Sequence, residues 1–474
     1  MKKERGLLEN TLILGAAAAL SKLAVFFLMP LYTACLTPSD FGVCEMIGNT
    51  VVFLLPLVGM GAPDALFRFA AGSAGERESL RSAGMLFLIG RCLFLLSFPF
   101  LGRIPVVGAY RIYLYFYVGA SLCRSFPAHL LRARGDYLFY GIEQLFDTLL
   151  TVALEFLFLP LFGWGIRGFL LSVILSDGVT AVLLALYLFI TRDKKDQGHF
   201  SFPLFRKMAA YALPLLPGAL LFSLLHLSGR FLLFHTHGSG EVGLFATAVR
   251  IPAVLSFAGT IFLEAFHYAA IKGKESTRGV LFGQAFRLFL PVLFSGAAGV
   301  LVLAPLFVSR FLSSAYGAAA RYVPVLTVSA LFSVLSAFLY NVYSVRFRTG
   351  RALFTAFLSS GLGICLNFLW IPRYGAPGAA FASLVSFAFL FLLRFLGCRA
   401  YMGIKEEAFK VLAGGGLLLF SALPLRRPVF LAFLSGALAL VPFFSEIREL
   451  LKTTCAKAAE WFVRFKNRKK SAGE

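Results

Sequence analysis

The sequence has few charged residues for its length, and acidic residues are the scarcest of them. Of 474 residues only 14% are charged, with 23 Asp and Glu against 45 Lys and Arg. A soluble domain carries about 25% charged residues. Because 59% of the chain is apolar and the mean hydropathy is +0.82, its apolar surface exceeds what one aqueous core can bury. The composition excludes a soluble globular protein and predicts an integral membrane protein.

The patterns of metal sites, disulfide frameworks and nucleic-acid surfaces are also lacking. The seven cysteines are scattered singly, mostly in or beside apolar runs, as expected of small membrane-buried side chains. His235 and His237 have no cysteine or acidic cluster near them, so neither a metal nor another cofactor is predicted. The net charge of +22 comes from short basic clusters between apolar runs, which is typical of cytoplasmic loops and not of nucleic-acid binding.

What the chain has in quantity is long apolar runs. A helix needs about 20 mainly apolar residues to cross the hydrocarbon core of a bilayer. The windows that meet this criterion lie at 11–36, 43–70, 83–101, 112–131, 138–160, 166–190, 208–234, 243–270, 281–309, 322–345, 352–371, 377–398, 409–424 and 428–445. They predict an all-α membrane protein of about 14 transmembrane helices, of which the last two are the shortest.

The distribution of Lys and Arg between the spans predicts the orientation. With the N-terminus inside, the inside segments carry 30 of the 45 basic residues, the outside segments carry 8, and 7 lie within spans. Cytoplasmic loops are the ones enriched in Lys and Arg, so both termini are expected in the cytoplasm. No outside segment exceeds about twelve residues, which leaves no room for an extracellular catalytic domain.

Two halves of six spans each resemble one another at an offset near 200 residues. The matching segments are 40–42 with 241–243, 64–71 with 264–270, 132–135 with 346–350, and 165–168 with 375–378. Six is an even number, so both halves enter the membrane in the same direction and are parallel repeats. Proteins of this kind bind their substrate between the halves and alternate access by rocking.

The repeat suggests a division of the chain into five segments. We expect an N-terminal six-helix bundle at 1–190, a cytoplasmic linker at 191–207 and a C-terminal six-helix bundle at 208–398. Two additional membrane helices follow at 399–445, and a basic cytoplasmic tail at 446–474 is expected to lie at the anionic inner leaflet.

Three motifs carry a family resemblance. They are Asn10-Thr11-Leu12-Ile13-Leu14-Gly15, Leu36-Thr37-Pro38-Ser39-Asp40-Phe41-Gly42, and the run from Ile371-Pro372-Arg373-Tyr374-Gly375 to Ala382. With them the chain resembles, over nearly its whole length, the polysaccharide-transporter (Wzx-type) oligosaccharide flippases of the MOP (MATE-like) superfamily. These motifs are turn and packing signals, so they identify an architecture better than a substrate.

The resemblance implies a function and a location. It implies a flippase that moves undecaprenyl-diphosphate-linked oligosaccharide from the inner to the outer leaflet of the bacterial plasma (inner) membrane, by alternating access, for polysaccharide biosynthesis. The expected partners are therefore the lipid-linked oligosaccharide diphosphate, the lipid bilayer and a coupling ion, with no nucleic acid.

Basic side chains inside the spans are the candidate substrate-binding residues. Lys22, Arg91, Arg124 and Arg250 lie nearest mid-depth, where each costs about 2.5–3.5 kcal/mol. Arginine matches phosphate oxygens in pairs and lysine supplies a point charge, so we expect these four to bind the diphosphate. In an alternative, Asp147 or Asp177 neutralises Arg91 and Arg124 across a helix interface. The other three, Arg68, Arg230 and Arg287, lie near span ends and are expected to snorkel.

Two acid–base pairs occupy matching places in the two halves. Asp64 and Arg68 are spaced i,i+4 on one helix face, and Glu264 and His267 are spaced i,i+3. The simplest interpretation is a local ion pair in each half. We also regard the four residues as candidates for gate or coupling contacts.

Two other functions compete with the flippase. A cation-coupled multidrug exporter of the MATE type would share the repeat but would use buried carboxylates, because acids attract organic cations; Asp147 and Asp177 are of this kind. A membrane polysaccharide polymerase or ligase would need a long outside loop with paired Arg, His or carboxylates, and the sequence has none. The chain is therefore not expected to be an enzyme, and the identity of the sugar stays open.

Overall fold

The three-dimensional structure is a computed structural model that describes residues 20–21, 23–24, 26–70, 75–97, 99, 108–191, 199–257, 259, 262–263, 275–346, 349–404 and 407–422. These residues form helices joined by short turns, with no strand in the described ranges. Eight of the described helices have the length and apolar composition needed to cross a membrane. The predicted all-α membrane architecture is confirmed, whereas the window at 428–445, and residues 11–19, 22 and 25 of the one at 11–36, lie outside the described residues.

The N-terminal group of helices runs from α2 to α9. Its members are α2 (Met29–Cys35), α3 (Pro38–Gly59), α4 (Ala62–Ala70), α5 (Glu76–Leu96), α7 (Arg111–Arg134), α8 (Tyr137–Phe156), a π turn (Leu157–Leu161) and α9 (Gly165–Ile190). Helix α3 begins with a capping box, in which the Thr37 hydroxyl accepts from the Asp40 amide and the Asp40 carboxylate accepts from the Thr37 amide. Pro38 occupies the first turn, where its missing N–H has no consequence.

The predicted span at 43–70 is wrong as a single helix. It is divided between α3 and α4 by two residues with positive φ, Met60 at 49° and Gly61 at 65°. Gly61 also lies against Ala212, since a Cβ on it would come within 3.0 Å of the Ala212 Cβ. The sequence around the break stays apolar, so hydropathy alone does not reveal it.

The C-terminal group begins with α11 and ends with α18. It comprises α11 (Leu216–His237), α12 (Ser239–Arg250), α14 (Glu275–Phe311), η3 (Ser314–Arg321), α15 (Val323–Val345), α16 (Thr349–Tyr374), α17 (Ala376–Met402) and α18 (Glu407–Ala422). Between the two groups lie α10 (Phe202–Ala212) and the 3₁₀ turn η2 (Leu213–Leu215).

Helix α10 packs on the N-terminal group, although it leads into the C-terminal one. Leu204 and Met208 of α10 share a buried cluster with Ala62, Leu66 and Ala83 of α4 and α5. The chain then bends at η2, next to two prolines, and α11 continues toward the other group. The division into segments at 190, 207, 398 and 445 stays a prediction.

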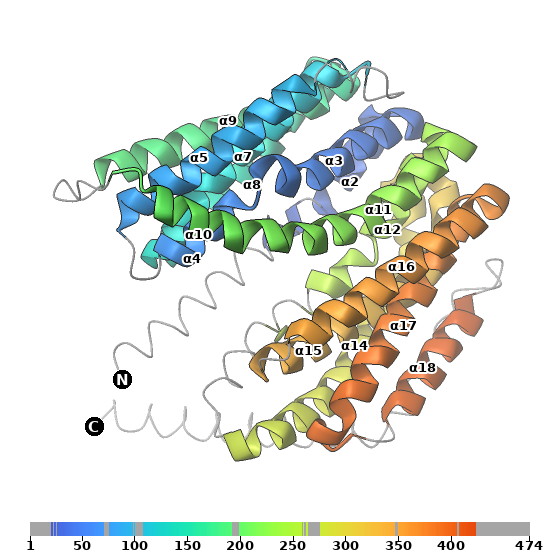
Figure 1. Ribbon diagram of the computed structural model, residues 1–474. Helices are drawn as coiled ribbons and strands as arrows, with labels where there is room; N and C mark the ends of the chain where they lie inside the picture. The colour runs from blue at the N-terminus through green and yellow to red at the C-terminus, as the bar shows by residue number, and fades with distance from the viewer. Residues whose placement is uncertain are drawn as a thin grey trace, which may run out of the picture.

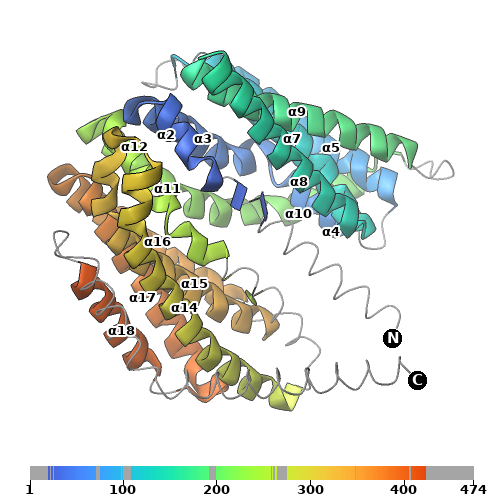
Figure 2. The same cartoon turned by 180° about the vertical axis from the view of Figure 1, so that it is seen from behind.

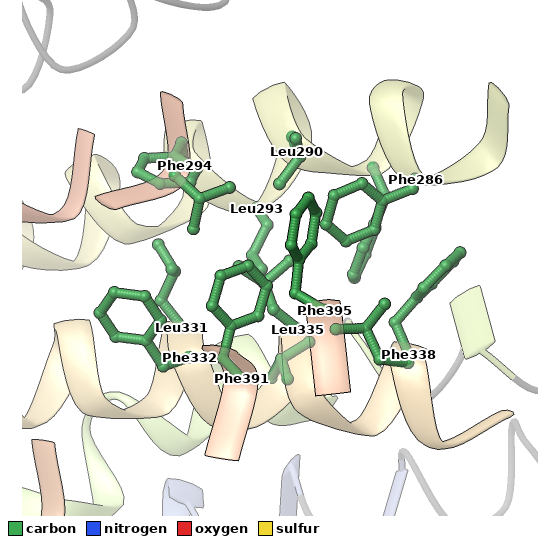
Figure 3. Close-up of a cluster of buried hydrophobic side chains, with 14 of the residues drawn as sticks. Phe286, Leu290, Leu293, Phe294, Leu331, Phe332, Leu335, Phe338, Phe391 and Phe395 are labelled. Carbon is green, nitrogen blue, oxygen red and sulfur yellow. The ribbon is translucent and has the colours of Figure 1, made fainter. Parts of the chain in front are cut away.

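The two groups lie close together at one end and diverge from there, as seen from both sides in Figures 1 and 2. They meet where α3, α11 and α12 pack on one another. The C-terminal group has an aromatic core, in which phenylalanines of α14, α15 and α17 interleave (Figure 3). Phe286, Phe294, Phe338 and Phe391 are fully buried there, so this group is a packed bundle in its own right.

The crossing of α3 and α12 is the closest approach between the two groups. A Cβ on Gly42 would overlap the backbone oxygen of Ser239, and a Cβ on Gly243 would overlap the backbone oxygen of Pro38. The hydroxyls of Ser39 and Ser239 are hydrogen-bonded across the same crossing. The two glycine contacts are counterparts of each other, so the repeat seen in the sequence is present as a pair of equivalent helices packed on each other.

A second pair of glycine positions supports the same repeat. Gly165 and Gly375 have φ of 53° and 62° and stand at the starts of α9 and α17. Three residues later, Gly168 and Gly378 lie against the preceding helical turn, where a Cβ would come within 3.2 Å and 2.6 Å of the backbone oxygens of Phe158 and Trp370. The matching sequences therefore build matching turns.

We predict that Gly42→Ala destabilises the protein, because the new methyl group meets a backbone oxygen that cannot move without separating α3 from α12. Overpacking of this kind costs about 1–3 kcal/mol. Gly48→Ala is the control: it lies on the same helix, and nothing lies within 4 Å of the place its new methyl group would take. Thermal unfolding of detergent-purified protein should show a lower midpoint for Gly42→Ala alone; equal midpoints would contradict the close crossing.

Candidate functional site

A cluster of charged side chains joins the two groups next to the glycine crossing. The Glu45 carboxylate on α3 accepts a bond of 2.6 Å from Arg250 Nη2 on α12, and it lies 3.7 Å from Arg230 Nη2 on α11. Asn49, one turn after Glu45, accepts a hydrogen bond from Arg230 and donates to the Glu45 backbone oxygen. One carboxylate therefore holds two guanidinium groups.

Two aromatic rings form cation–π contacts with the Arg250 guanidinium. Its guanidinium carbon lies 5.0 Å from the centre of the Tyr32 ring and 4.8 Å from that of Phe41. The Tyr32 hydroxyl donates a 2.7 Å bond to Glu155 of α8, a carboxylate that is only 1% exposed. In this inter-group cluster (Glu45, Glu155, Arg230, Arg250) the N-terminal group supplies both carboxylates, and the C-terminal group supplies both guanidiniums.

The inter-group cluster is only partly satisfied. Arg230 Nε and Arg250 Nη1 are buried and have no hydrogen-bond partner among the described residues. Buried donors without partners cost free energy, so the contact is a poor device for stability alone.

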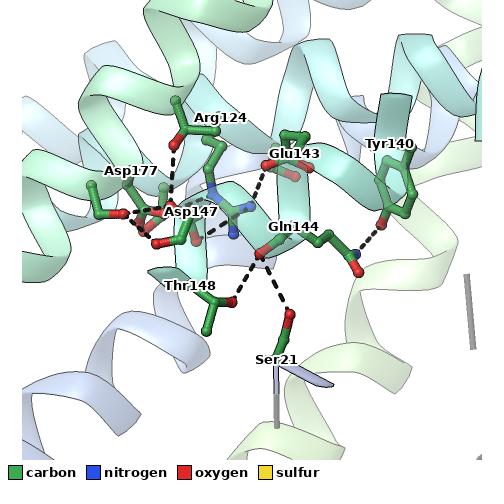
Figure 4. A network of polar contacts seen from close by, with 12 residues as sticks. Ser21, Arg124, Tyr140, Glu143, Gln144, Asp147, Thr148 and Asp177 are labelled. Atoms are coloured by element: carbon green, nitrogen blue, oxygen red, sulfur yellow. Dashed lines mark hydrogen bonds and ion pairs between the residues drawn. The ribbon is translucent and has the colours of Figure 1, made fainter. Parts of the chain in front are cut away.

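A second charged cluster lies inside the N-terminal group (Figure 4). Arg124 of α7 donates from Nη1 to Glu143 at 2.6 Å and from Nε to Asp177 at 2.7 Å, and Nη1 lies 3.7 Å from Asp147. The Ser121 hydroxyl also donates to Asp177. The expected alternative for Arg124, pairing with Asp147 or Asp177, is found in the structure, with Glu143 as a third partner that the sequence did not indicate.

Three carboxylates around one guanidinium leave an excess of negative charge inside the N-terminal group. Asp147 also accepts hydrogen bonds from Ser176 at 2.9 Å and from Thr180 at 3.4 Å. Hydroxyl donors of this kind stabilise a carboxylate without neutralising it. The Arg124 cluster (Arg124, Glu143, Asp147, Asp177) thus has the composition of a site for a cation or a proton.

Arg91 lies in a different place, a groove between α5, α7 and α9 with a volume of about 1620 Å³. Its Nη1 donates to Cys123 Sγ at 2.9 Å, and its guanidinium lies 5.5 Å from the centre of the Phe87 ring. Gly119 makes room for it, because a Cβ there would be 3.0 Å from Arg91 Nη2. No carboxylate of the described chain pairs with Arg91, so the predicted alternative pairing with Asp147 or Asp177 is wrong for this residue.

The candidate gate pair in the N-terminal half is arranged differently from expectation. Asp64 lies 3.8 Å from His129 Nε2 on α7, and no ion pair joins it to Arg68 in the described ranges. Helix α4 packs on α7, which brings the first turn of α4 to His129. Its predicted counterparts Glu264 and His267, like the candidate ligand Lys22, lie outside the described residues.

The structure therefore gives Arg91, Arg124 and Arg250 three separate sets of partners. Snorkelling was the expectation for Arg230 and Arg287; it is wrong for Arg230, whose side chain is only 14% exposed, and it stays a prediction for Arg287, whose side chain is 49% exposed. Arg230 is paired within the inter-group cluster, and Arg287 donates to Glu407 at 2.7 Å, linking α14 to α18. Position along a span does not show which neighbouring helix holds a counter-charge.

The residue that sequence reasoning missed is Glu45. It was not among the candidate site residues, yet it is the centre of the inter-group cluster. A signal was present: Glu45 follows Gly42 by three residues and Arg250 follows Gly243 by seven, so each charge lies on the same helix face as a crossing glycine.

Comparisons with solved structures define the class of protein. The fold matches an "inward-facing conformation of a multidrug resistance MATE family transporter of the MOP superfamily" with a TM-score of 0.65 at 14% identity, over 81% of this chain and 99% of that one. The outward-facing conformation of a multidrug resistance MATE family transporter of the MOP superfamily matches with a TM-score of 0.58 at 14% identity, over 84% of this chain and 97% of that one. A MOP superfamily transporter from Pyrococcus furiosus Vc1, described with the words "reverse polarity of binding pocket suggests different function", matches with a TM-score of 0.58 at 16% identity, over 84% of this chain and 96% of that one. The chain has the MOP transporter fold.

The family follows from the sequence. The family model described as "Polysaccharide biosynthesis protein" matches residues 7–265, which is more than half of the chain. The protein belongs to that family of multi-pass membrane proteins, as the resemblance had implied. No curated protein matches the chain.

We predict that Glu45→Gln lowers the thermal stability of the purified protein, because Arg250 and Arg230 lose their shared carboxylate. Removing one partner of a buried ion pair costs about 3–5 kcal/mol. Asp64→Asn serves as control, since the Asp64 side chain is 67% exposed. The exchange Glu45→Arg with Arg250→Glu should recover part of the loss; a Glu45→Gln protein as stable as the parent would contradict the geometry.

Proposed function

We propose that this protein is a flippase that carries undecaprenyl-diphosphate-linked oligosaccharide from the inner to the outer leaflet of the bacterial plasma membrane by alternating access. The family match and the transporter fold support membrane transport in polysaccharide biosynthesis. The observation that supports an anionic substrate is the inter-group cluster. Because its guanidiniums belong to one group of helices and its carboxylates to the other, separating the groups presents unpaired arginines to the space between them.

A diphosphate is suited to replace Glu45. Arg230 on α11 and Arg250 on α12 both contact Glu45, and arginine binds phosphate oxygens through paired N–H donors. Of the four ligands proposed from the sequence, Arg250 keeps this role, and Lys22 and Arg91 remain proposed contributors. Arg124 is the weakest of them, since three carboxylates already neutralise its charge.

The predicted orientation of the chain supports an inward-open transport state for the structure. The groups meet at the end that carries residues 36–38 and 238–239, where Tyr316 of η3 also donates to the Leu36 backbone oxygen. The excess of Lys and Arg in the opposite connections supports an outside location for this end, with both termini cytoplasmic. The structure then corresponds to an inward-open state, in agreement with the higher score of the inward-facing relative.

The Arg124 cluster supplies a coupling site in this scheme. Its surplus of carboxylates fits a cation or proton that enters from outside and drives the return of the empty carrier. No reaction on the substrate is required, which agrees with a transporter that is not an enzyme.

The same surplus of carboxylates supports a second candidate, an exporter of organic cations. Such a protein would bind its substrate at Asp147 and Asp177, and its activity would not require Arg250. The names of the structural relatives include multidrug MATE transporters, whose fold this chain shares. The two functions therefore differ in which cluster touches the substrate.

We predict that Arg250→Ala abolishes export of surface polysaccharide in a strain that depends on this protein, because the diphosphate loses a ligand. Arg373→Ala, an exposed arginine at the end of α16, should export normally at the same membrane level. Normal export by the Arg250→Ala protein would show that the diphosphate does not bind at α12. The exporter would be favoured if the parent strain resists cationic dyes, if Asp177→Asn abolishes this resistance, and if Arg250→Ala leaves it intact.

We also predict that a disulfide between Ser39→Cys and Ser239→Cys, in a protein whose native cysteines are replaced, stops transport. The two hydroxyls are hydrogen-bonded, so a disulfide between these positions holds the outer end closed. Export should fall to background under oxidation and return on reduction, whereas each single variant should stay active. Full export by the cross-linked protein would show that the groups do not separate there.

A further inference from the structure

A small chamber inside the C-terminal group has no role in the scheme above. It has a volume of about 230 Å³ and is lined by α11, α12, α15, α16 and α17, together with residues 252–256. This is several times the volume of about 30 Å³ that one water molecule occupies in the liquid. The chamber lies directly behind Arg230, which contributes to its wall.

The wall of the chamber holds polar side chains without partners. Asn367 and Ser329 are only 6% and 4% exposed, and neither they nor Ser333 form a hydrogen bond with another described residue. Gly229 on α11 allows the Asn367 amide to lie against that helix, because a Cβ there would be 3.1 Å from Nδ2. These polar side chains therefore line the chamber and can donate to a molecule or ion inside it, next to the buried Arg230 Nε, which has no hydrogen-bond partner among the described residues.

The charge and the hydrogen-bond donors of the chamber wall favour an anion as its ligand. Arg230 is the only charged residue among those that line the chamber, and none of the described lining residues is a carboxylate. Asn367 offers an N–H₂ group, and Ser329 and Ser333 offer hydroxyl protons, whereas Ser383 donates its proton to its own helix at 2.9 Å. A cation would find no counter-charge here, and an anion would find several donors next to a guanidinium.

We propose that this chamber, formed by Arg230, Ser329, Ser333 and Asn367, binds a small monovalent anion of halide size, which in the cell is chloride. The Asn367 amide and the two serine hydroxyls donate to the anion, and Arg230 supplies the opposite charge. The remaining volume holds the waters that complete the coordination of the anion.

The charge distribution between the two groups explains why the anion is needed. The C-terminal group brings Arg230 and Arg250 to the inter-group cluster but no carboxylate of that cluster. When the groups separate, as the proposed alternating access requires, Arg230 loses Glu45 and lacks a counter-charge until the diphosphate of the substrate binds. A chloride behind it stays with the C-terminal group and neutralises it. Binding of the anion does not depend on the identity of the substrate.

The test uses the purified full-length protein in detergent at constant ionic strength, with chloride, bromide, gluconate or inorganic phosphate as the anion. Chloride and bromide should each raise Tm by about 2 °C or more with saturation, relative to gluconate. Asn367→Leu and the pair Ser329→Ala with Ser333→Ala should lose this response. Ser383→Ala, whose hydroxyl proton is already used within α17, should keep it.

Several results would overturn the anion site. They are equal Tm in chloride and gluconate, stabilisation by phosphate but not by halides, and an unchanged halide response in both altered proteins. If Asn367→Leu does not fold, the serine pair decides alone. A bromide soak of crystals should also give an anomalous peak within hydrogen-bond distance of Asn367, and a chamber without it contains water only. Because no transport is measured, failure of the flippase proposal and failure of the anion site give different results.

Discussion

The close crossing of α3 and α12 at Gly42 and Gly243 is the constraint on which the rest of the structure depends. Only helices without side chains at these positions approach so closely that each Cβ would overlap a backbone oxygen of the other. The crossing fixes the rotation of both helices. Glu45 and Arg250, on the same faces one and two turns further, then meet at 2.6 Å. Packing therefore determines the electrostatics of the junction.

The two halves repeat each other in backbone and differ in charge. With Gly42 aligned to Gly243, Asn49 corresponds to Arg250 and Glu45 corresponds to Ala246. The N-terminal group contains the carboxylates of the inter-group cluster and the three that surround Arg124. The C-terminal group contributes guanidiniums and a chamber lined by donors. The opposite charges attract the two halves where they meet, and in the proposed cycle each half binds an ion of opposite sign when they separate.

The sequence was sufficient for the architecture and insufficient for the site. Long apolar runs bounded by glycine or arginine predicted α7, α9, α15 and α17 to within a few residues, because hydropathy and helix ends are local properties. The break at Met60 was missed because it lies within apolar sequence. The contact between Glu45 and Arg250 joins residues 205 positions apart, and depth within a span carries no information about such a partner. Arg124 shows the same limit, since one of its three acids was not expected.

The central claim is that the end held by the α3–α12 crossing opens while the opposite end closes. Distances between paired spin labels, measured by pulsed electron resonance in lipid nanodiscs, test this directly. One pair, at Phe162 and Ser313, lies at the end where the groups meet, and the other, at Leu138 and Arg351, lies at the opposite end; all four side chains are exposed. Under transport conditions with lipid-linked oligosaccharide, we expect the first distance to lengthen as the second shortens. Two distances that stay constant, or that change in the same direction, would contradict the account.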